Sequence, residues 1–173
     1  MNSLSDNQVS LYEEPVQEKI RKFIKIEFLL NKIYYFKGKD DRSENYIALL
    51  ALCELYEILS RSDIKSELIR EIETQNTYLQ TIKKIPQADN SKLNSVLEKQ
   101  SQLLKLIYGI EVNYLDHLAH DVFFKTILKN CFTQLQPASV DFWLSRDILN
   151  RETQIDLWLE PLIFIKRSID FIL

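Results

Sequence analysis

Apolar residues recur every three or four positions along most of this chain, with polar residues between them. This spacing places apolar side chains on one face of an α-helix, whereas a strand would alternate apolar and polar positions. Each segment is apolar on one side only, which predicts helices that pack on one another. The pattern defines seven expected helices, at about 15–37, 41–59, 62–83, 89–107, 112–131, 137–144 and 151–173.

Residues at the ends of these segments support the boundaries. Pro15 suits a first helical position, where its missing N–H has no partner to lose, and Gly38 suits a helix stop. Asp41 with Glu44 forms a capping pair, which satisfies free N–H groups at a helix start. The same reasoning predicts helix starts at Ser62 or Asp63, at Asp89 and Ser91, and at Asn150.

Length and composition agree with one all-α domain. The chain has 173 residues, 46% of them hydrophobic and 27% charged, which is enough to bury a core without a disulfide or a metal. Its two glycines are far fewer than an all-β protein with tight turns would use. We expect residues 1–11 to be disordered and residues 12–173 to form a single bundle of about seven helices.

Charge and hydropathy limit the cellular location and the classes of partner that we expect for this protein. The 22 Lys and Arg against 25 Asp and Glu leave a net charge of −3, which gives no general attraction to nucleic acid or to an anionic membrane. No apolar run reaches the roughly 18–20 residues needed to cross a bilayer. Residues 1–10 also lack the basic and apolar regions of a signal peptide. We therefore expect a cytoplasmic protein without membrane insertion and without a nucleic-acid partner.

Little in the sequence supports catalysis. Phosphate loops and serine nucleophiles are built on glycine-containing turns, and the two glycines stand far apart. His117 and His120 are three residues apart on an expected helix, as metal ligands can be, but no second pair completes a site, so we favour surface histidines. We predict no catalytic residue, no metal and no cofactor. Cys53 and Cys131 are expected to be reduced and partly buried.

One carboxylate interrupts an apolar stripe. At 100° per residue, Glu27 falls within the stripe of the first expected helix, so we expect a structural buried carboxylate. Such a group needs a cation or hydrogen-bond donors, either within the fold or at a protein interface. The sequence is compatible with both possibilities. The stripe consists of Ile20, Phe23, Ile24, Leu30 and Tyr34.

Basic residues gather in three places. The first expected helix carries Arg21, Lys22, Lys25 and Lys32 on the side opposite Glu27; Arg61 and Lys65 open the third, and Lys83 and Lys84 close it. Each group suits a solvated helix face. A cluster of this kind also suits an acidic peptide, because arginine grips a carboxylate with two parallel hydrogen bonds.

Several motifs, in order along nearly the whole chain, resemble those of the ZapD family of cell division proteins. The first is Tyr12-Glu13-Glu14-Pro15 followed by Val16 to Arg21, and the next is Lys25-Ile26-Glu27 with flanking aliphatic residues. The third runs from Arg61 to Leu68. The last markers are Phe142-Trp143-Leu144, Arg151, Trp158 and the final Ile169-Asp170-Phe171-Ile172-Leu173. Gln17 and Lys25 depart from the Asn and Arg usual in the family.

The resemblance implies a function. ZapD proteins are homodimers that bind the C-terminal tail of FtsZ, the tubulin-like division protein, and cross-link its filaments in the division ring at midcell. The resemblance makes Arg61 the first candidate for contacting the acidic tail. The further candidates are Lys65, Arg21 and Lys25. The family continues into a β-rich domain, so we expect this chain to be a fragment, the alternative being a naturally short relative. A self-associating helical scaffold that has lost the tail-binding half is the other functional interpretation.

Overall fold

The computed structural model describes residues 18–131, 133 and 137–173, and this part of the chain is helical and contains no strand. The all-α class is therefore confirmed. The expected disordered segment 1–11 and Pro15 lie outside the described residues. The elements are α1 (Glu18–Phe36), α2 (Arg42–Ser60), α3 (Ile64–Ile82), α4 (Asn90–Gly109), α5 (Asp116–His120), α6 (Val122–Asn130), α7 (Ala138–Leu144), α8 (Ile148–Leu159), the 3₁₀ turn η1 (Glu160–Leu162) and α9 (Ile163–Ile172).

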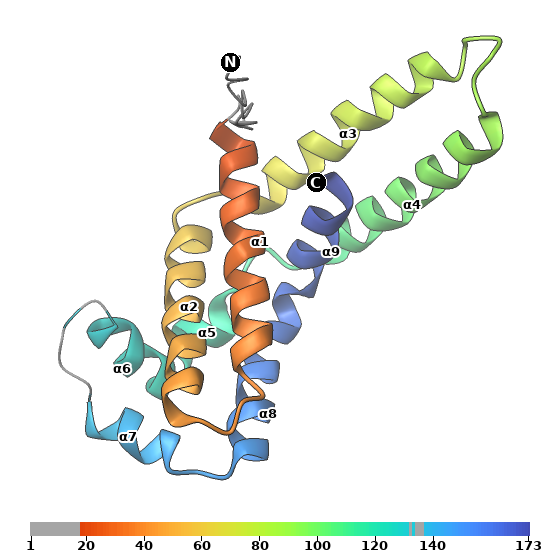
Figure 1. Ribbon diagram of the computed structural model, residues 1–173. Helices are drawn as coiled ribbons and strands as arrows, with labels where there is room; N and C mark the ends of the chain where they lie inside the picture. The colour runs from red at the N-terminus through yellow and green to blue at the C-terminus, as the bar shows by residue number, and fades with distance from the viewer. Residues whose placement is uncertain (1–17, 132, 134–136) are drawn as a thin grey trace, which may run out of the picture.

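Helices α1 and α2 form an antiparallel pair at the centre of the molecule (Figure 1). The buried residues of α1 recur at helical spacing, and small side chains such as Ala48 and Ala51 on α2 allow the two backbones to approach closely. Helices α8 and α9 run back along this pair, and α9 packs against α1, α3 and α4. The buried set of α1 is Phe23, Ile26, Leu29, Leu30 and Ile33.

Short helices α5, α6 and α7 close the lower end of the pair (Figure 1). Their contacts are aromatic: the ring of Phe123 on α6 stacks on Trp143 of α7 and on Trp158 of α8, with centroids 5.9 Å and 6.1 Å apart. Phe124 and Trp158 add an edge-on contact at 5.6 Å. Because stacked aromatic rings bury large areas, these residues fix the position of the short helices.

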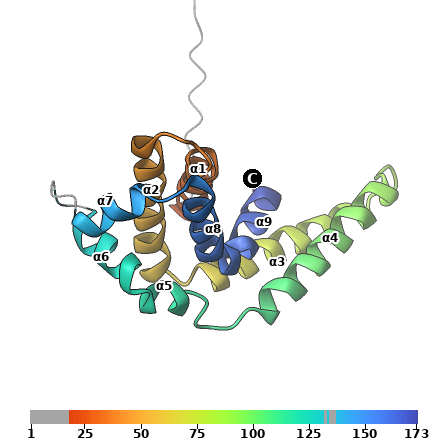
Figure 2. The same cartoon turned by 90° about the horizontal axis from the view of Figure 1, so that it is seen from below.

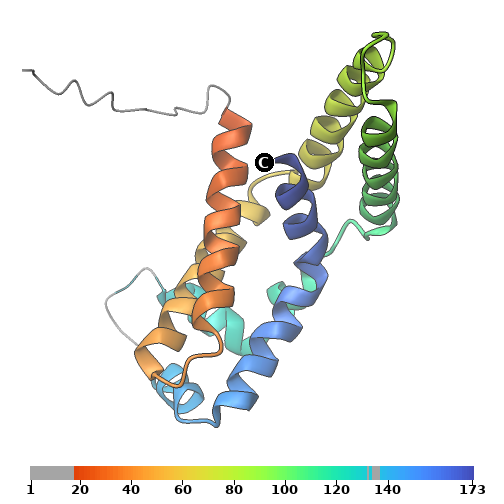
Figure 3. The same ribbon diagram turned by 45° about the vertical axis from the view of Figure 1, so that its right-hand side comes forward.

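The hairpin of α3 and α4 projects from the body as an arm (Figures 1 and 3). Ile72 on α3 and Gln100 on α4 are buried, but no side chain between them is. The distal half of the arm is thus stabilised only by the partly buried contacts between α3 and α4. The expected single bundle is accurate for the body and does not describe this arm.

Three of the predicted helix caps are confirmed. Asp41 accepts from Ser43 N at 2.7 Å and Glu44 N at 3.2 Å, Asp63 accepts from Ser66 N at 3.2 Å, and Asp89 accepts from Lys92 N at 3.1 Å. The predicted cap Asn150 is wrong, because Asp147 caps α8 by accepting from Leu149 N at 2.8 Å.

Two expected helices are divided. The segment 112–131 breaks at Asp121, whose carboxylate accepts from Phe124 N at 2.7 Å and so begins a new helix. The segment 151–173 is interrupted by η1, where Pro161 lacks the N–H that an α-helix needs. These breaks account for nine α-helices among the described residues in place of about seven.

Arg151 is buried at the lower end of the body, with 3% of its surface exposed. Its guanidinium donates to Leu144 O at 3.2 Å and to Asp40 O at 3.4 Å. It therefore joins the end of α7 to the α1–α2 loop, and the partial negative charge of a helix C-terminus favours a cation there.

Candidate protein-binding surface

The predicted binding residues lie on the first half of α1 and at the junction between α2 and α3. Because α1 and α2 are antiparallel, the first half of α1 lies beside the end of α2 and the start of α3. Lys25 Nζ lies 2.6 Å from Glu54 Oε1 on α2, and Lys22 Nζ lies 2.7 Å from Glu67 Oε1 on α3. We call Arg21, Lys25, Arg61 and Lys65 the α1–α3 corner.

Acidic residues from neighbouring helices neutralise much of this corner. Besides the pairs of Lys22 and Lys25, Lys19 pairs with Glu71 and Arg61 pairs with Glu57. The Arg61 side chain nevertheless remains 79% exposed, and its partner lies one turn earlier on the same helix. Exposed pairs of this kind contribute about 0–1 kcal/mol, so a carboxylate of another molecule can displace Glu57 at little cost.

Lys65 differs from Arg61 in its surroundings. Its half-buried ammonium donates to Ile110 O at a distance of 2.5 Å. The bond joins the start of α3 to the residue that follows α4, so it stabilises the base of the arm. The ammonium of Lys65 is thus used in a contact within the fold, whereas the exposed guanidinium of Arg61 can bind a partner.

The expectation of a buried Glu27 is wrong, because the residue is half-buried. The buried face of α1 is centred near Ile26 and Ile33, which are fully buried, whereas Ile24 is 41% exposed. Glu27 lies one residue from Ile26, which is about 100° around the helix. The carboxylate therefore lies at the edge of the buried face, where water can reach it.

The side of α1 opposite its buried face carries apolar and aromatic residues that the sequence analysis missed. Ile24, Phe28 and Tyr35 are 41%, 57% and 62% exposed. Lys32 Nζ lies 6.0 Å from the ring centroid of Phe28, and Lys39 Nζ lies 4.4 Å from that of Tyr35. We call these five residues the α1 ridge. The spacing of residues 24, 28 and 35 is itself helical. This second apolar stripe is the sequence signal from which the exposed residues could have been predicted.

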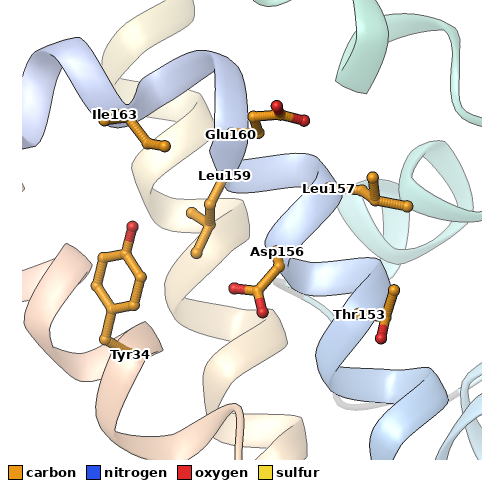
Figure 4. Close-up of a pocket in the computed structure, with 7 residues that line it drawn as sticks. All are labelled: Tyr34, Thr153, Asp156, Leu157, Leu159, Glu160 and Ile163. Carbon is orange, nitrogen blue, oxygen red and sulfur yellow. The ribbon is translucent and has the colours of Figure 1, made fainter.

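A pocket of about 440 Å³ lies between α1 and the α8–α9 segment (Figure 4). Tyr34 on α1 faces Asp156 and Leu159 on α8, and Glu160 and Ile163 complete the rim. Burial raises the pKa of the Tyr34 hydroxyl, and the charge of Asp156 raises it further.

The charge of the Asp156 carboxylate in this pocket is neutralised by a lysine. Lys37 Nζ lies 2.6 Å from Asp156 Oδ1 and 3.0 Å from Glu152 Oε1. The carboxylate of Asp156 is therefore paired with a lysine of the same chain. The pair joins the residue that follows α1 to α8.

The histidines considered as metal ligands bind backbone carbonyls. The ring nitrogens of His117 lie 3.0 Å from Tyr114 O and 2.9 Å from Trp158 O, and His120 Nδ1 lies 2.7 Å from Asp116 O. The Nε2 contact with Trp158 O places the His117 ring between α5 and α8, whereas the Nδ1 contact with Tyr114 O is local. Across the described residues, no group of three or more potential ligands is placed to hold a metal, and no helix there has the length and apolarity to cross a membrane.

A sequence model of the ZapD family, described as a cell division protein, matches residues 24–173. The chain is similar to Cell division protein ZapD of Azoarcus sp. (strain BH72), at 28% identity over 167 residues that cover 94% of this chain and 66% of that protein. The corresponding proteins of Aromatoleum aromaticum and Nitrosomonas eutropha are also 28% identical, with coverage of 65% and 66% of their lengths. The chain thus spans slightly less than two thirds of the length of these relatives.

Proposed function

Because this chain belongs to the ZapD family of cell division proteins, we propose that it binds the C-terminal tail of the tubulin-like protein FtsZ. As a homodimer it holds two tails at once, cross-links FtsZ filaments and so stabilises the division ring at midcell in the cytoplasm. It acts by binding alone, with no reaction catalysed and no cofactor.

The exposed guanidinium of Arg61 carries this proposal. Its side chain, at the junction of α2 and α3, is 79% exposed. An acidic tail offers carboxylates, and arginine binds a carboxylate through two parallel charge-assisted hydrogen bonds. Lys65, whose ammonium is bound to Ile110 O, supports the position of this corner.

Bivalency explains how modest contacts produce filament bundling. When one subunit has bound a tail, the second subunit is held near the other tails along the filament. The second binding event then proceeds at a high effective concentration, which raises the overall affinity without a new contact. A single tail site of low affinity is therefore sufficient.

Co-sedimentation tests the proposed partner. The purified chain is expected to pellet with FtsZ filaments and to stay in the supernatant when the FtsZ lacks its tail. Pelleting that is equal with tail-less FtsZ would show that the tail is not the ligand. A protein that forms a stable oligomer and binds neither form would instead be a self-associating scaffold.

Charge reversal tests the proposed residue. Arg61→Glu is expected to weaken tail binding at least tenfold, because a carboxylate then faces the acidic tail beside Glu57. Arg42→Glu is the matched control, since Arg42 is also exposed and lies at the opposite end of α2. Equal affinities of the two variants would move the binding site away from Arg61.

A further inference from the structure

We propose that the α1 ridge (Ile24, Phe28, Lys32, Tyr35 and Lys39) is the docking surface for a linear acidic segment that carries apolar side chains. This inference rests on the proposed function, in which that segment is the FtsZ tail. The ridge would supply the apolar contacts with the tail, whereas the α1–α3 corner supplies only cations.

The position of the ridge makes it accessible. Ile24, Phe28 and Tyr35 lie on the side of α1 opposite Ile26 and Ile33, which face the core. Helices α2, α8 and α9 lie together on one side of α1, and no described helix covers the other (Figure 2). Three large apolar side chains in a row on an exposed helix face are unusual unless they bind something.

The cations of the ridge are also unpaired with carboxylates. Neither Lys32 nor Lys39 has a carboxylate of the described residues within 4.0 Å of its ammonium. Their charges lie over the rings of Phe28 and Tyr35, which leaves N–H groups free to bind an acid. Lys25, 5.9 Å from the Phe28 ring centroid, connects the ridge to the α1–α3 corner.

The shape and charge of the ridge indicate its occupant. From Ile24 to Lys39 the ridge measures roughly 20 Å, which matches an extended segment of about six or seven residues. Alternating aromatic and cationic groups complement a segment that alternates apolar and acidic residues. The chain as a whole carries a net charge of −3, which disfavours general binding of polyanions such as nucleic acid.

Tail-peptide binding to ridge variants tests this assignment. Fluorescence anisotropy with a labelled FtsZ C-terminal tail peptide would give the dissociation constant for each variant of the full chain. Phe28→Ala with Tyr35→Ala is expected to weaken binding at least tenfold, and Lys32→Glu alone several-fold. Phe28 and Tyr35 are exposed, and the half-buried Lys32 lies beside Phe28, so circular dichroism should show an unchanged fold.

A matched control is available elsewhere on the molecule. Phe142 is 68% exposed with Arg146 at 5.9 Å from its ring centroid, and Tyr78 is 67% exposed. The double variant Phe142→Ala with Tyr78→Ala removes the same two ring types from α7 and α3. Its dissociation constant should stay within twofold of the wild-type value.

The outcomes separate this inference from the proposed function. Wild-type protein that does not bind the peptide contradicts both. Wild-type binding with equal loss in the ridge and control variants, or with no loss in either, overturns the ridge while tail binding stands. Ridge variants that dissociate a wild-type dimer in light scattering would show that a second copy occupies the ridge, which also overturns the assignment.

Discussion

Burial changes the chemistry of individual side chains in this fold. Cys53 on α2 is fully buried, and burial raises the pKa of its thiol well above 9.0, with the neighbouring Cys131 raising it further. Burial also raises the pKa of the Tyr114 hydroxyl, from 10.0 to about 12, with the charge of Asp63 contributing. Both groups therefore stay protonated in the folded protein at a pH where they ionise in the unfolded chain.

This difference predicts a loss of stability in alkali. Above pH 9 the unfolded chain releases the Cys53 proton and the folded protein keeps it, so rising pH favours unfolding by up to about 1.4 kcal/mol per pH unit. Urea unfolding at pH 8, 9 and 10 should show the free energy of unfolding falling mainly between pH 9 and pH 10. Below pH 9 the contribution of this thiol is fully present.

A Cys53→Ala variant isolates the thiol. Its free energy of unfolding should depend less steeply on pH between 9 and 10 than that of the wild type, whatever its absolute stability. The pH dependence that remains in this variant then reports the ionisation of Tyr114 and other groups. Identical slopes in the two proteins would show that Cys53 ionises normally in the folded state.

At the scale of elements, one carboxylate joins two helices. Asp121 caps α6 through Phe124 N at 2.7 Å, and its second oxygen accepts from Trp158 Nε1 on α8 at 3.2 Å. The same residue ends α5, so it sets the break between the two short helices. A local cap is thus also a tertiary contact.

Substitution of this residue should cost more than that of an ordinary cap. We predict that Asp121→Ala lowers the free energy of unfolding by about 2–3 kcal/mol, because the loss of the cap leaves the buried indole N–H of Trp158 without a partner. Asp89→Ala should cost only about 1 kcal/mol, since the exposed Asp89 caps α4 through Lys92 N and otherwise makes only an exposed ion pair with the Lys92 ammonium, at 3.5 Å. Urea unfolding followed by circular dichroism gives both values, and equal costs would contradict the tertiary role of Asp121.

At the scale of the whole molecule, stability is unevenly distributed. The body holds most of the buried side chains, whereas the arm has none between Ile72 and Gln100. Regions with few buried contacts open locally at low free-energy cost. The distal arm is therefore the least protected helical part of the described structure.

Hydrogen exchange should reveal this division. We predict that amides of residues 77–98 exchange orders of magnitude faster than those of Ile26 to Ile33 and Leu49 to Leu55. The reason is that opening the arm exposes little buried apolar surface, while opening α1 or α2 disrupts the core. Mass spectrometry of peptides across the chain measures this directly. Uniform protection along α3 and α4 would mean that the arm is covered in solution.

Some features of this protein follow from the sequence alone. The helices were predictable because their apolar periodicity and their caps at Asp41, Asp63 and Asp89 act within four residues of the chain. The family resemblance was visible in local motifs for the same reason. One of those motif residues, Arg151, is a buried structural arginine, which a sequence motif does not distinguish from a binding residue.

The tertiary structure alone decided which surface is available to a partner. Lys22 and Lys65 lie 45 residues from the groups that bind them, Glu67 and Ile110, so their engagement was invisible along the chain. The orientation of α1 was likewise decided by packing: several neighbouring stripes on the helix are apolar, and only contact with α2 and α9 selects the one around Ile26. That choice leaves Phe28 and Tyr35 in water, because a helix can bury one face against its neighbours while its opposite face stays exposed.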